Sequence, residues 1–234
     1  MLDERSRLIL EAVIRDYIES GEPVSSGSVF RRHKFGIKPA MIRSVLSRLT
    51  DQGFLNQPHH SAGRVPSDLG YEFFAARAIA DARERLHESD KFLELLERGM
   101  WDDLVRDLSG YLGLATVAEN FGQGIVRKRG LEELFRHLAI NSKEEAVEVV
   151  KDFETIEDRL DKLERDVNEI GVYVGSKSPI TKSEELSVVA SRYETDDGPL
   201  LLLAIGPKRM NYEKVARVFK GLKEAKPNKT KKKK

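Results

Sequence analysis

The 234-residue sequence contains no cysteine. Without thiols there is no disulfide scaffold, thiolate zinc site, iron–sulfur cluster or thiol nucleophile. No apolar run approaches the roughly 18–20 residues that a membrane span needs, and the opening segment is too charged for a signal peptide. Because 40% of the residues are hydrophobic, the chain has enough apolar material for folded cores. These features predict a soluble, cytoplasmic protein with no membrane partner.

Patterns that support catalysis or metal binding are also missing. His59 and His60 are adjacent, but they lack the further convergent ligands of a metal site. The segment Gly122-Gln123-Gly124 lacks the Lys-Ser/Thr pair that completes a phosphate-binding loop. The sequence has no Ser, His and Asp order and no carboxylate pair with a supporting glycine motif. We therefore expect no enzymatic activity, no catalytic residue, no metal and no cofactor.

Acidic and basic residues are nearly balanced, at 39 and 40, but they are unevenly distributed. Residues 76–175 carry a net charge of −8, and residues 176–234 carry +8. Between residues 28 and 64 there are seven basic side chains and one acid, Asp51. A local excess of this kind favours a polyanionic partner over an ordinary solvated surface. The end of the chain, 226–234, contains six lysines and a proline and predicts a disordered tail.

The first 53 residues predict three helices. The first is amphipathic and ends near Gly21, and Ser25 or Ser26 can cap a short second helix with Val29 and Phe30 facing inward. The third helix begins at a proline, which is favoured at a first helical position because its missing N–H costs nothing there. Its predicted start and inward-facing residues are Pro39, Ile42, Val45, Leu46 and Leu49.

A short hairpin is predicted to follow the three helices. Residues 54–57 and 64–66 are strand-like, and the loop between them, 58–63, is polar and contains glycine. Three helices followed by a small hairpin with a basic, polar tip are typical of a winged helix-turn-helix. In a helix-turn-helix, the second helix of the pair presents its N-terminal half to base edges in the major groove. The hairpin tip can reach the backbone or the minor groove.

This pattern indicates a set of candidate DNA-contacting residues. They are Arg31, Lys38, Ala40, Met41, Arg43, Ser44, Ser47, Arg48, His59, His60, Ser61 and Arg64. For Met41 two interpretations are equally good: contact with a thymine methyl, or packing against the hairpin. Arg64 is either a phosphate contact beside the hairpin tip or a strand residue paired with Asp51 or Asp68.

The remaining two thirds of the chain predict long helices and a sheet. Apolar residues recur every four positions over 92–112, which indicates one long amphipathic helix. From the capping box at Ser142-x-x-Glu145 to Ile170, apolar residues alternate three and four apart. Such a helix either covers one face of a sheet, which we favour, or forms an intermolecular coiled coil. Three strands are predicted, at 172–174, 186–190 and 200–205.

Two groups of motifs carry a family resemblance. The first comprises Gly21-Glu22-Pro23-Val24, Pro39-Ala40-x-Ile42-Arg43, Gly53-Phe54-Leu55-x-Gln57-Pro58-His59, Ser61-Ala62-Gly63-Arg64-Val65-Pro66 and Gly70-Tyr71. The second is Ile205-Gly206-Pro207-x-Arg209-Met210-x-Tyr212-Glu213. Together they resemble the HrcA heat-inducible transcription repressor family. The resemblance is dense over 1–75 and thinner over about 125–222.

The resemblance implies a repressor of chaperone genes that binds double-stranded DNA as a homodimer on an inverted-repeat operator. It also implies a GAF-like domain and assistance by a chaperonin in folding. The sequence departs from the family at Lys38, Met41 and Ser44, which lie on the expected base-reading face. Family members are usually much longer, and here the first part of the GAF-like sheet and an inserted dimerising domain are expected to be missing.

We therefore predict an α+β fold, with an N-terminal winged helix-turn-helix and a reduced GAF-like α/β domain with long helices. The expected segments are a DNA-binding domain over 1–75, a linker with long helices over 76–113, the GAF-like domain over 114–225 and the tail over 226–234. Because the helices over 90–170 offer more apolar faces than three strands can cover, they are expected to form the dimer. The alternatives are a winged-helix regulator controlled by a small ligand, and an enzyme with an accessory winged helix.

Overall fold

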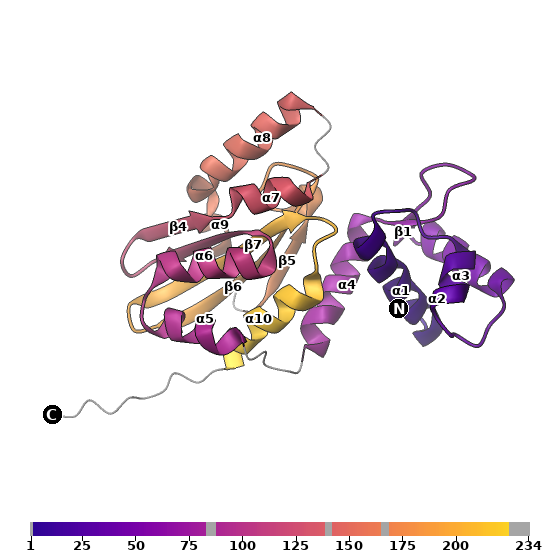
Figure 1. Cartoon of the computed structure of the whole chain (residues 1–234), viewed down its shortest axis with the longest axis horizontal. Helices are drawn as coiled ribbons and strands as arrows, with labels where there is room; N and C mark the ends of the chain where they lie inside the picture. Colours follow the sequence, from indigo (N-terminus) through magenta and orange to yellow (C-terminus); the bar gives the residue numbers. More distant parts are fainter. Residues whose placement is uncertain (1, 83–87, 139–141, 165–168, 225–234) are drawn as a thin grey trace. The chain divides into compact units, whose positions relative to one another are not determined.

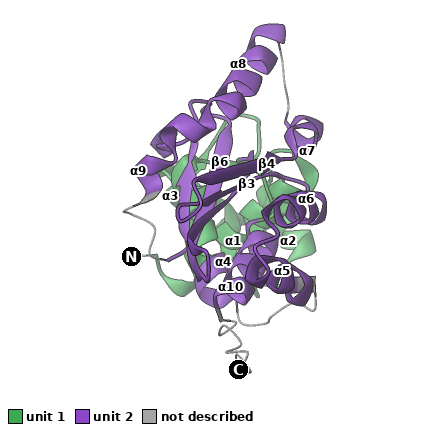
Figure 2. Ribbon diagram, turned by 90° about the vertical axis from the view of Figure 1, so that its left-hand side faces the viewer, with its two compact units in different colours: residues 1–77, 208–211 green, residues 78–207, 212–234 purple. Residues whose placement is uncertain are grey.

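The structure is a computed structural model that describes residues 2–82, 88–138, 142–164 and 169–224. The chain divides into two compact units, shown in different colours in Figure 2. Unit 1 comprises Met1–Arg77 and Lys208–Asn211, and unit 2 comprises Ala78–Pro207 and Tyr212–Lys234. The predicted lysine-rich tail lies outside the described residues.

Unit 1 contains three helices followed by two short strands (Figure 1). The helices are α1 (Glu4–Ser20), α2 (Ser26–Arg32) and α3 (Pro39–Asp51), and the strands are β1 (Leu55–Asn56) and β2 (Val65–Pro66). The two strands pair antiparallel, and an isolated bridge between Val24 and Arg64 extends the pairing. Helix α4 (Asp68–Asp81) follows and continues into unit 2.

Local signals set the helix boundaries in unit 1 as the sequence predicts. Helix α1 ends at Gly21, which adopts the left-handed conformation with φ 71° that glycine accommodates without strain. Ser25 caps α2 in a capping box with Ser28, and Pro39 occupies the first turn of α3. The four inward residues of α3 are all buried, which confirms their assignment. The prediction for Phe30 was wrong, because its side chain is 47% exposed.

Unit 2 is built on a five-stranded antiparallel sheet in the order β4-β3-β7-β6-β5. The strands are β3 (Ala115–Asn120), β4 (Ile125–Arg129), β5 (Gly171–Val174), β6 (Leu186–Thr195) and β7 (Gly198–Pro207). The three predicted strands are present as β5, β6 and β7, and the prediction missed β3 and β4. Strands β3 and β4 form a hairpin, and β4 escaped notice because three of its five residues are charged. Those charges suit its position at the edge of the sheet.

Helices pack against both faces of this sheet. On one face lie α7 (Leu131–His137), α8 (Lys143–Glu154), the 3₁₀ turn η1 (Ile156–Arg159) and α9 (Asp161–Glu164). On the other face lie α5 (Glu88–Glu97), α6 (Trp101–Leu112) and α10 (Tyr212–Glu224). The central strand β7 is buried along both faces. Side chains of these helices therefore cover both faces of the sheet.

Both long helices predicted from apolar spacing are interrupted. The stripe over 92–112 is split between α5 and α6, because Gly99 adopts a positive φ of 66° between them. The segment from Ser142 breaks after Glu154 into η1 and α9. Most residues of the 92–112 stripe are buried, but Met100, which lies at the break, is 39% exposed. Apolar spacing therefore identifies most of the buried positions without revealing the break.

A buried ion pair holds the second break in place. The guanidinium of Arg159 lies 2.6 Å from a carboxylate oxygen of Asp152 and donates a hydrogen bond to the Ile180 carbonyl oxygen at 2.5 Å. The second Asp152 oxygen accepts a hydrogen bond from the Lys182 amide at 2.7 Å. These bonds connect α8 and η1 to the segment between β5 and β6. They also satisfy charges whose burial is costly when unpaired.

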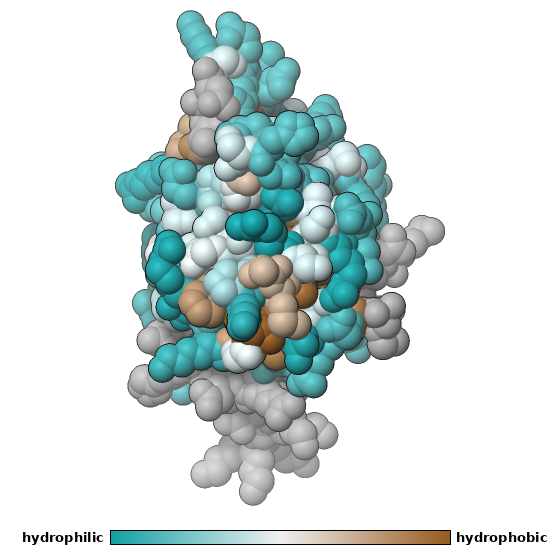
Figure 3. Space-filling view, turned by 90° about the vertical axis from the view of Figure 1, so that its right-hand side faces the viewer, coloured by the Kyte–Doolittle hydropathy of each residue, from teal (hydrophilic) through white to brown (hydrophobic). Residues whose placement is uncertain are grey.

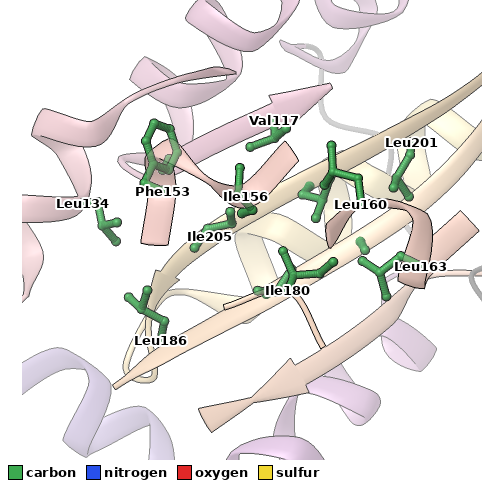
Figure 4. Close-up of a cluster of buried hydrophobic side chains, with 14 of the residues drawn as sticks. Val117, Leu134, Phe153, Ile156, Leu160, Leu163, Ile180, Leu186, Leu201 and Ile205 are labelled. Carbon is green, nitrogen blue, oxygen red and sulfur yellow. The ribbon is translucent and has the colours of Figure 1, made fainter. Parts of the chain in front are cut away.

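The apolar residues after α8 cover the sheet, as the favoured interpretation predicts. Ile156, Leu160 and Leu163 are buried, and they lie over the sheet residues Val117 and Leu201 (Figure 4). The coiled-coil interpretation was wrong.

The prediction that residues 90–170 form the dimer assumed apolar faces that the sheet leaves uncovered. The sheet covers most of these faces. Phe92, Leu96 and Leu104 are also buried, and five strands rather than three receive these apolar side chains. Helices α5 and α6 belong to the same unit as the sheet, so the predicted linker segment over 76–113 is not separate from it.

Replacing Leu160 with alanine should lower the free energy of unfolding by about 2–5 kcal/mol, because it removes a fully buried side chain and leaves a cavity. The matched control is Val147→Ala on α8. Val147 is 41% exposed, so this change should cost within about 0.5 kcal/mol. Urea unfolding followed by circular dichroism measures both. Similar losses in the two variants would contradict the packing of Leu160 on the sheet.

Candidate nucleic-acid interface

Helix α3 has one buried side and one exposed side. With 3.6 residues per turn, burial of Ile42, Val45, Leu46 and Leu49 turns the opposite side of the helix outward. The centre of that outward side consists of the small residues Ala40, Ser44 and Ser47, all exposed. The longer side chains Arg43 and Met41 lie on its two flanks. Small residues along the centre allow the helix backbone to approach a partner closely.

The N-terminal end of α3 has no acidic side chain in its first turn. Lys38 occupies the N-cap position and makes no capping hydrogen bond with its side chain. The partial positive charge at a helix N-terminus is therefore reinforced by a lysine instead of being offset by a carboxylate. This arrangement suits an anionic partner such as a phosphate.

Two acids of α1, Glu11 and Asp16, are buried in unit 1. The largely buried carboxylate of Asp16 lies 2.9 Å from a guanidinium nitrogen of Arg32 and 3.1 Å from Nε2 of His33. Glu11, also largely buried, pairs with Arg7 at 2.9 Å. Arg31 and Arg32 are both exposed, and Arg32 also pairs with Asp16.

The hairpin loop is a folded turn with an exposed tip. Its residues His59, His60 and Ser61 are all exposed. The side-chain amide of Gln57 donates to the His60 carbonyl oxygen at 2.9 Å and to the Ala62 carbonyl oxygen at 3.2 Å. Gln57 was not among the predicted site residues, yet it shapes the tip. In the sequence, the only indication of this role for Gln57 was its position inside the loop motif.

The base of the hairpin is held against the segment between α1 and α2. A Cβ atom at Gly63 would lie 2.6 Å from the Val24 carbonyl carbon and oxygen, so only glycine fits there. The neighbouring Arg64 exchanges two backbone hydrogen bonds of 2.8 Å with Val24. Its Nε donates to the Thr50 hydroxyl at 2.9 Å, while Asp68 pairs with Lys208 at 2.7 Å. Arg64 thus makes a hydrogen bond to α3, whereas the predicted alternative was an ion pair with Asp51 or Asp68.

Arg48 also has a partner within unit 1. Its guanidinium Nη2 donates to a carboxylate oxygen of Asp3 at 3.1 Å and to the Ser6 hydroxyl oxygen. Asp3 is the N-cap of α1 and accepts a hydrogen bond from the Ser6 amide at 2.9 Å. In the structure the exposed side chain of Arg48 ties α3 to the start of α1, and its contact with DNA stays a prediction.

Of the twelve predicted contact residues, eleven are exposed and Arg64 is partly exposed. Six of them lie on α3, with Lys38 at its N-cap, and the others lie on α2 and the hairpin. Figure 3 faces the side on which Figure 1 draws α2 and α3, and shows a mainly hydrophilic surface with a small apolar group.

Unit 2 offers no comparable basic surface on its charged edge strand. Arg127 and Arg129 of β4 both pair with Asp102, at 2.7 Å and 2.9 Å, and Lys128 pairs with Glu157 at 2.9 Å. Within the described ranges, no group of three or more His, Asp or Glu residues is arranged to hold a metal ion. Of the helices described, none is both long enough and apolar enough to span a membrane.

A small helical unit with an exposed basic helix and a polar hairpin tip, joined to an antiparallel α/β unit, defines a candidate nucleic-acid-binding protein of two units. The family model "HrcA protein C terminal domain" matches residues 71–216, which is more than half of the chain. The chain belongs to the HrcA family.

Curated relatives support this assignment. The chain is 40% identical over 111 residues to the "Heat-inducible transcription repressor HrcA" of Desulforamulus reducens, covering 47% of this chain and 30% of that protein. It is 49% identical over 112 residues to the protein of the same name from Carboxydothermus hydrogenoformans, covering 48% and 31%. The aligned part of this chain therefore spans about a third of the length of these relatives.

A solved structure has the same fold. It superimposes with a TM-score of 0.77 at 18% identity and covers 95% of this chain and 96% of its own. That protein is described as hypothetical, so the likeness concerns the fold alone.

Two hydrogen bonds from Ser6 and the nearby charge of Arg48 hold the pKa of Asp3 below its ordinary value of 3.8. We expect Ser6→Ala, which removes the hydroxyl bond but keeps the amide bond, to raise this pKa part of the way towards 3.8. Arg48→Gln should raise it less, because the charge of Arg48 contributes less than the Ser6 bonds. Carboxyl NMR titration of the full chain measures the three values.

The sign of the linkage follows from the lowered pKa. The stabilisation from the Asp3 carboxylate is fully present above the unfolded pKa and is lost as the pH falls through the folded pKa. A larger pKa rise in Arg48→Gln than in Ser6→Ala would contradict the ranking of the two causes.

Proposed function

We propose that this chain is a sequence-specific DNA-binding transcription repressor of heat-shock genes, and that unit 1 is its winged helix-turn-helix. The observation that carries the proposal is the exposed side of α3, with small residues at its centre, long side chains on its flanks and no acid in its first turn. Membership in a family whose curated relatives are named heat-inducible transcription repressors supports it.

In this proposal α2 and α3 form the helix-turn-helix, and β1 with β2 forms the wing. The N-terminal half of a recognition helix enters the major groove and contacts base edges. We assign this role to Ala40, Met41, Arg43, Ser44 and Ser47. Arg31 and Lys38 then contact phosphates, and His59, His60, Ser61 and Arg64 contact the backbone or the minor groove from the wing.

The C-terminal half of α3 takes less part in this contact. Arg48 is engaged with Asp3 and Ser6. Asp51 is exposed at the end of the outward side, where its carboxylate would repel phosphates. Both features favour a docking geometry in which only the first turns of α3 approach the bases.

Arg43→Ala should weaken binding to the preferred duplex by about 1–3 kcal/mol, the usual contribution of a bidentate base contact. The preferred duplex is first selected from a random library with the full chain, and affinity is then measured by fluorescence anisotropy against a scrambled duplex. Arg136→Ala on the exposed face of α7 is the matched control, since it removes one charge far from α3 in sequence.

Three outcomes decide this prediction. A loss on the preferred duplex alone supports base readout by Arg43. An equal loss on both duplexes would make Arg43 a phosphate contact, and no loss on either would remove it from the interface. Failure of the wild-type chain to enrich any sequence would overturn the proposed function.

The proposed repressor acts as a homodimer that occludes promoters at an inverted repeat. One winged helix reads too few base pairs for the usual specific affinity, and a two-fold pair matches a palindromic site. The unit 2 sheet serves as a reduced GAF-like dimerisation domain in this proposal. Since the apolar stripes of α5, α6 and η1 are buried, the contact between subunits must use other surfaces.

Sedimentation equilibrium should find two chains on one labelled duplex that carries the selected inverted repeat. A duplex with a single half-site should bind more weakly, because it loses the second contact. Saturation of the inverted repeat by one chain would contradict the dimer and leave the DNA-binding role of α3 intact.

The family resemblance also supports a chaperonin as the partner that controls the amount of active repressor. When heat-damaged proteins occupy the chaperonin, less of the repressor would fold and its target genes would be released. Refolding from denaturant with and without chaperonin, assayed by duplex binding, tests this partner. Equal yields of active repressor in both conditions would contradict it.

A further inference from the structure

Met41 is a large apolar side chain that unit 1 leaves half exposed. Its relative exposure is 50%, although the next residue in α3, Ile42, is fully buried. It belongs to a small set of large apolar residues exposed in the described part of unit 1, with Leu8, Phe30 and Leu69. Met41 alone among these four lies on α3, in its first turn.

The position of Met41 on α3 sets what it can contact. At 100° per residue, Met41 and Arg43 lie about 160° apart across the outward side of the helix, on opposite flanks of Ala40, Ser44 and Ser47. Because these three residues are small, a helix docked along them brings both long side chains towards the floor of the groove. The two side chains then reach different base pairs.

The chemistry of the two side chains differs in a way that the major groove can distinguish. Arg43 carries hydrogen-bond donors that suit guanine O6 and N7. Met41 carries a flexible, polarisable thioether with no strong donor or acceptor. The apolar group on base edges in the major groove is the C5 methyl of thymine. Against any other base edge, Met41 would cover polar groups without making hydrogen bonds to them.

We propose that Met41 is a specificity-determining residue that packs against the C5 methyl of a thymine near the base pair contacted by Arg43. This inference rests on the proposed function, since it requires α3 to enter the major groove. The sequence left two interpretations of Met41, contact with a thymine methyl or packing against the hairpin. The proposal separates them, because a side chain that only supported the hairpin would not make binding depend on a methyl group of the DNA.

The test is a thermodynamic cycle between the Met41 side chain and a single methyl group on DNA. In the preferred duplex, each thymine is replaced in turn by deoxyuridine, which lacks only the C5 methyl. At one position the wild-type chain should bind about fourfold more weakly, the effect of removing one methyl from an apolar contact. Met41→Ala should bind the two duplexes equally.

Two further variants serve as controls. Arg43→Ala should keep the fourfold sensitivity to the methyl while losing overall affinity, because its contact lies on the other flank. Met41→Gln keeps the length of the side chain but makes its end polar, so it should lose the sensitivity even if Met41→Ala proves unstable. Equal unfolding midpoints in urea establish that the variants are folded.

The outcomes separate this inference from the proposed function. If a preferred duplex is found but wild type, Met41→Ala and Met41→Gln respond alike to every deoxyuridine, Met41 does not read thymine, while the repressor function stands. If the wild-type chain enriches no sequence from the library, the proposed function fails and the role of Met41 fails with it.

Discussion

Burial of one side of α3 in the core of unit 1 is the constraint on which the candidate interface depends. Ile42 and Leu49 on α3, and Ile9 and Val13 on α1, are all fully buried. Because an α-helix has a fixed period, burying those positions determines which residues of α3 face outward. The hairpin keeps its place by backbone contacts instead, since Gly63 allows the two segments at its base to approach closely.

Charge is distributed in unit 1 so that the start of α3 keeps its basic character. The two buried acids of α1, Glu11 and Asp16, pair with Arg7, Arg32 and His33. Arg48 is drawn towards α1 by Asp3. The cations left for a partner therefore lie near the N-terminus of α3, where the helix dipole adds to their field. A net charge of +1 for the whole chain hides this local excess.

Unit 2 follows a different principle, in which one strand organises the packing on both sides. Strand β7 lies at the centre of the sheet and is buried along both faces, so helices must cover each of them. The helices on one face are held by the buried pair of Asp152 and Arg159, which anchors a break that apolar spacing does not reveal. A compact sheet unit results, although the aligned part of this chain spans about a third of the related repressors.

The sequence by itself determined the ends of the first three helices, the buried side of α3 and the residues that cover the sheet, since caps and apolar periodicity are properties of neighbouring residues. Tertiary structure decided the breaks after Gly99 and Glu154, the edge strand β4 and the partner of Arg48. Asp3 and Arg48 lie 45 residues apart, and Asp152 pairs with Arg159 across the break between α8 and η1. Such partners depend on which segments the fold brings together, because an ion pair needs its two atoms within a few ångströms and local sequence does not encode that distance.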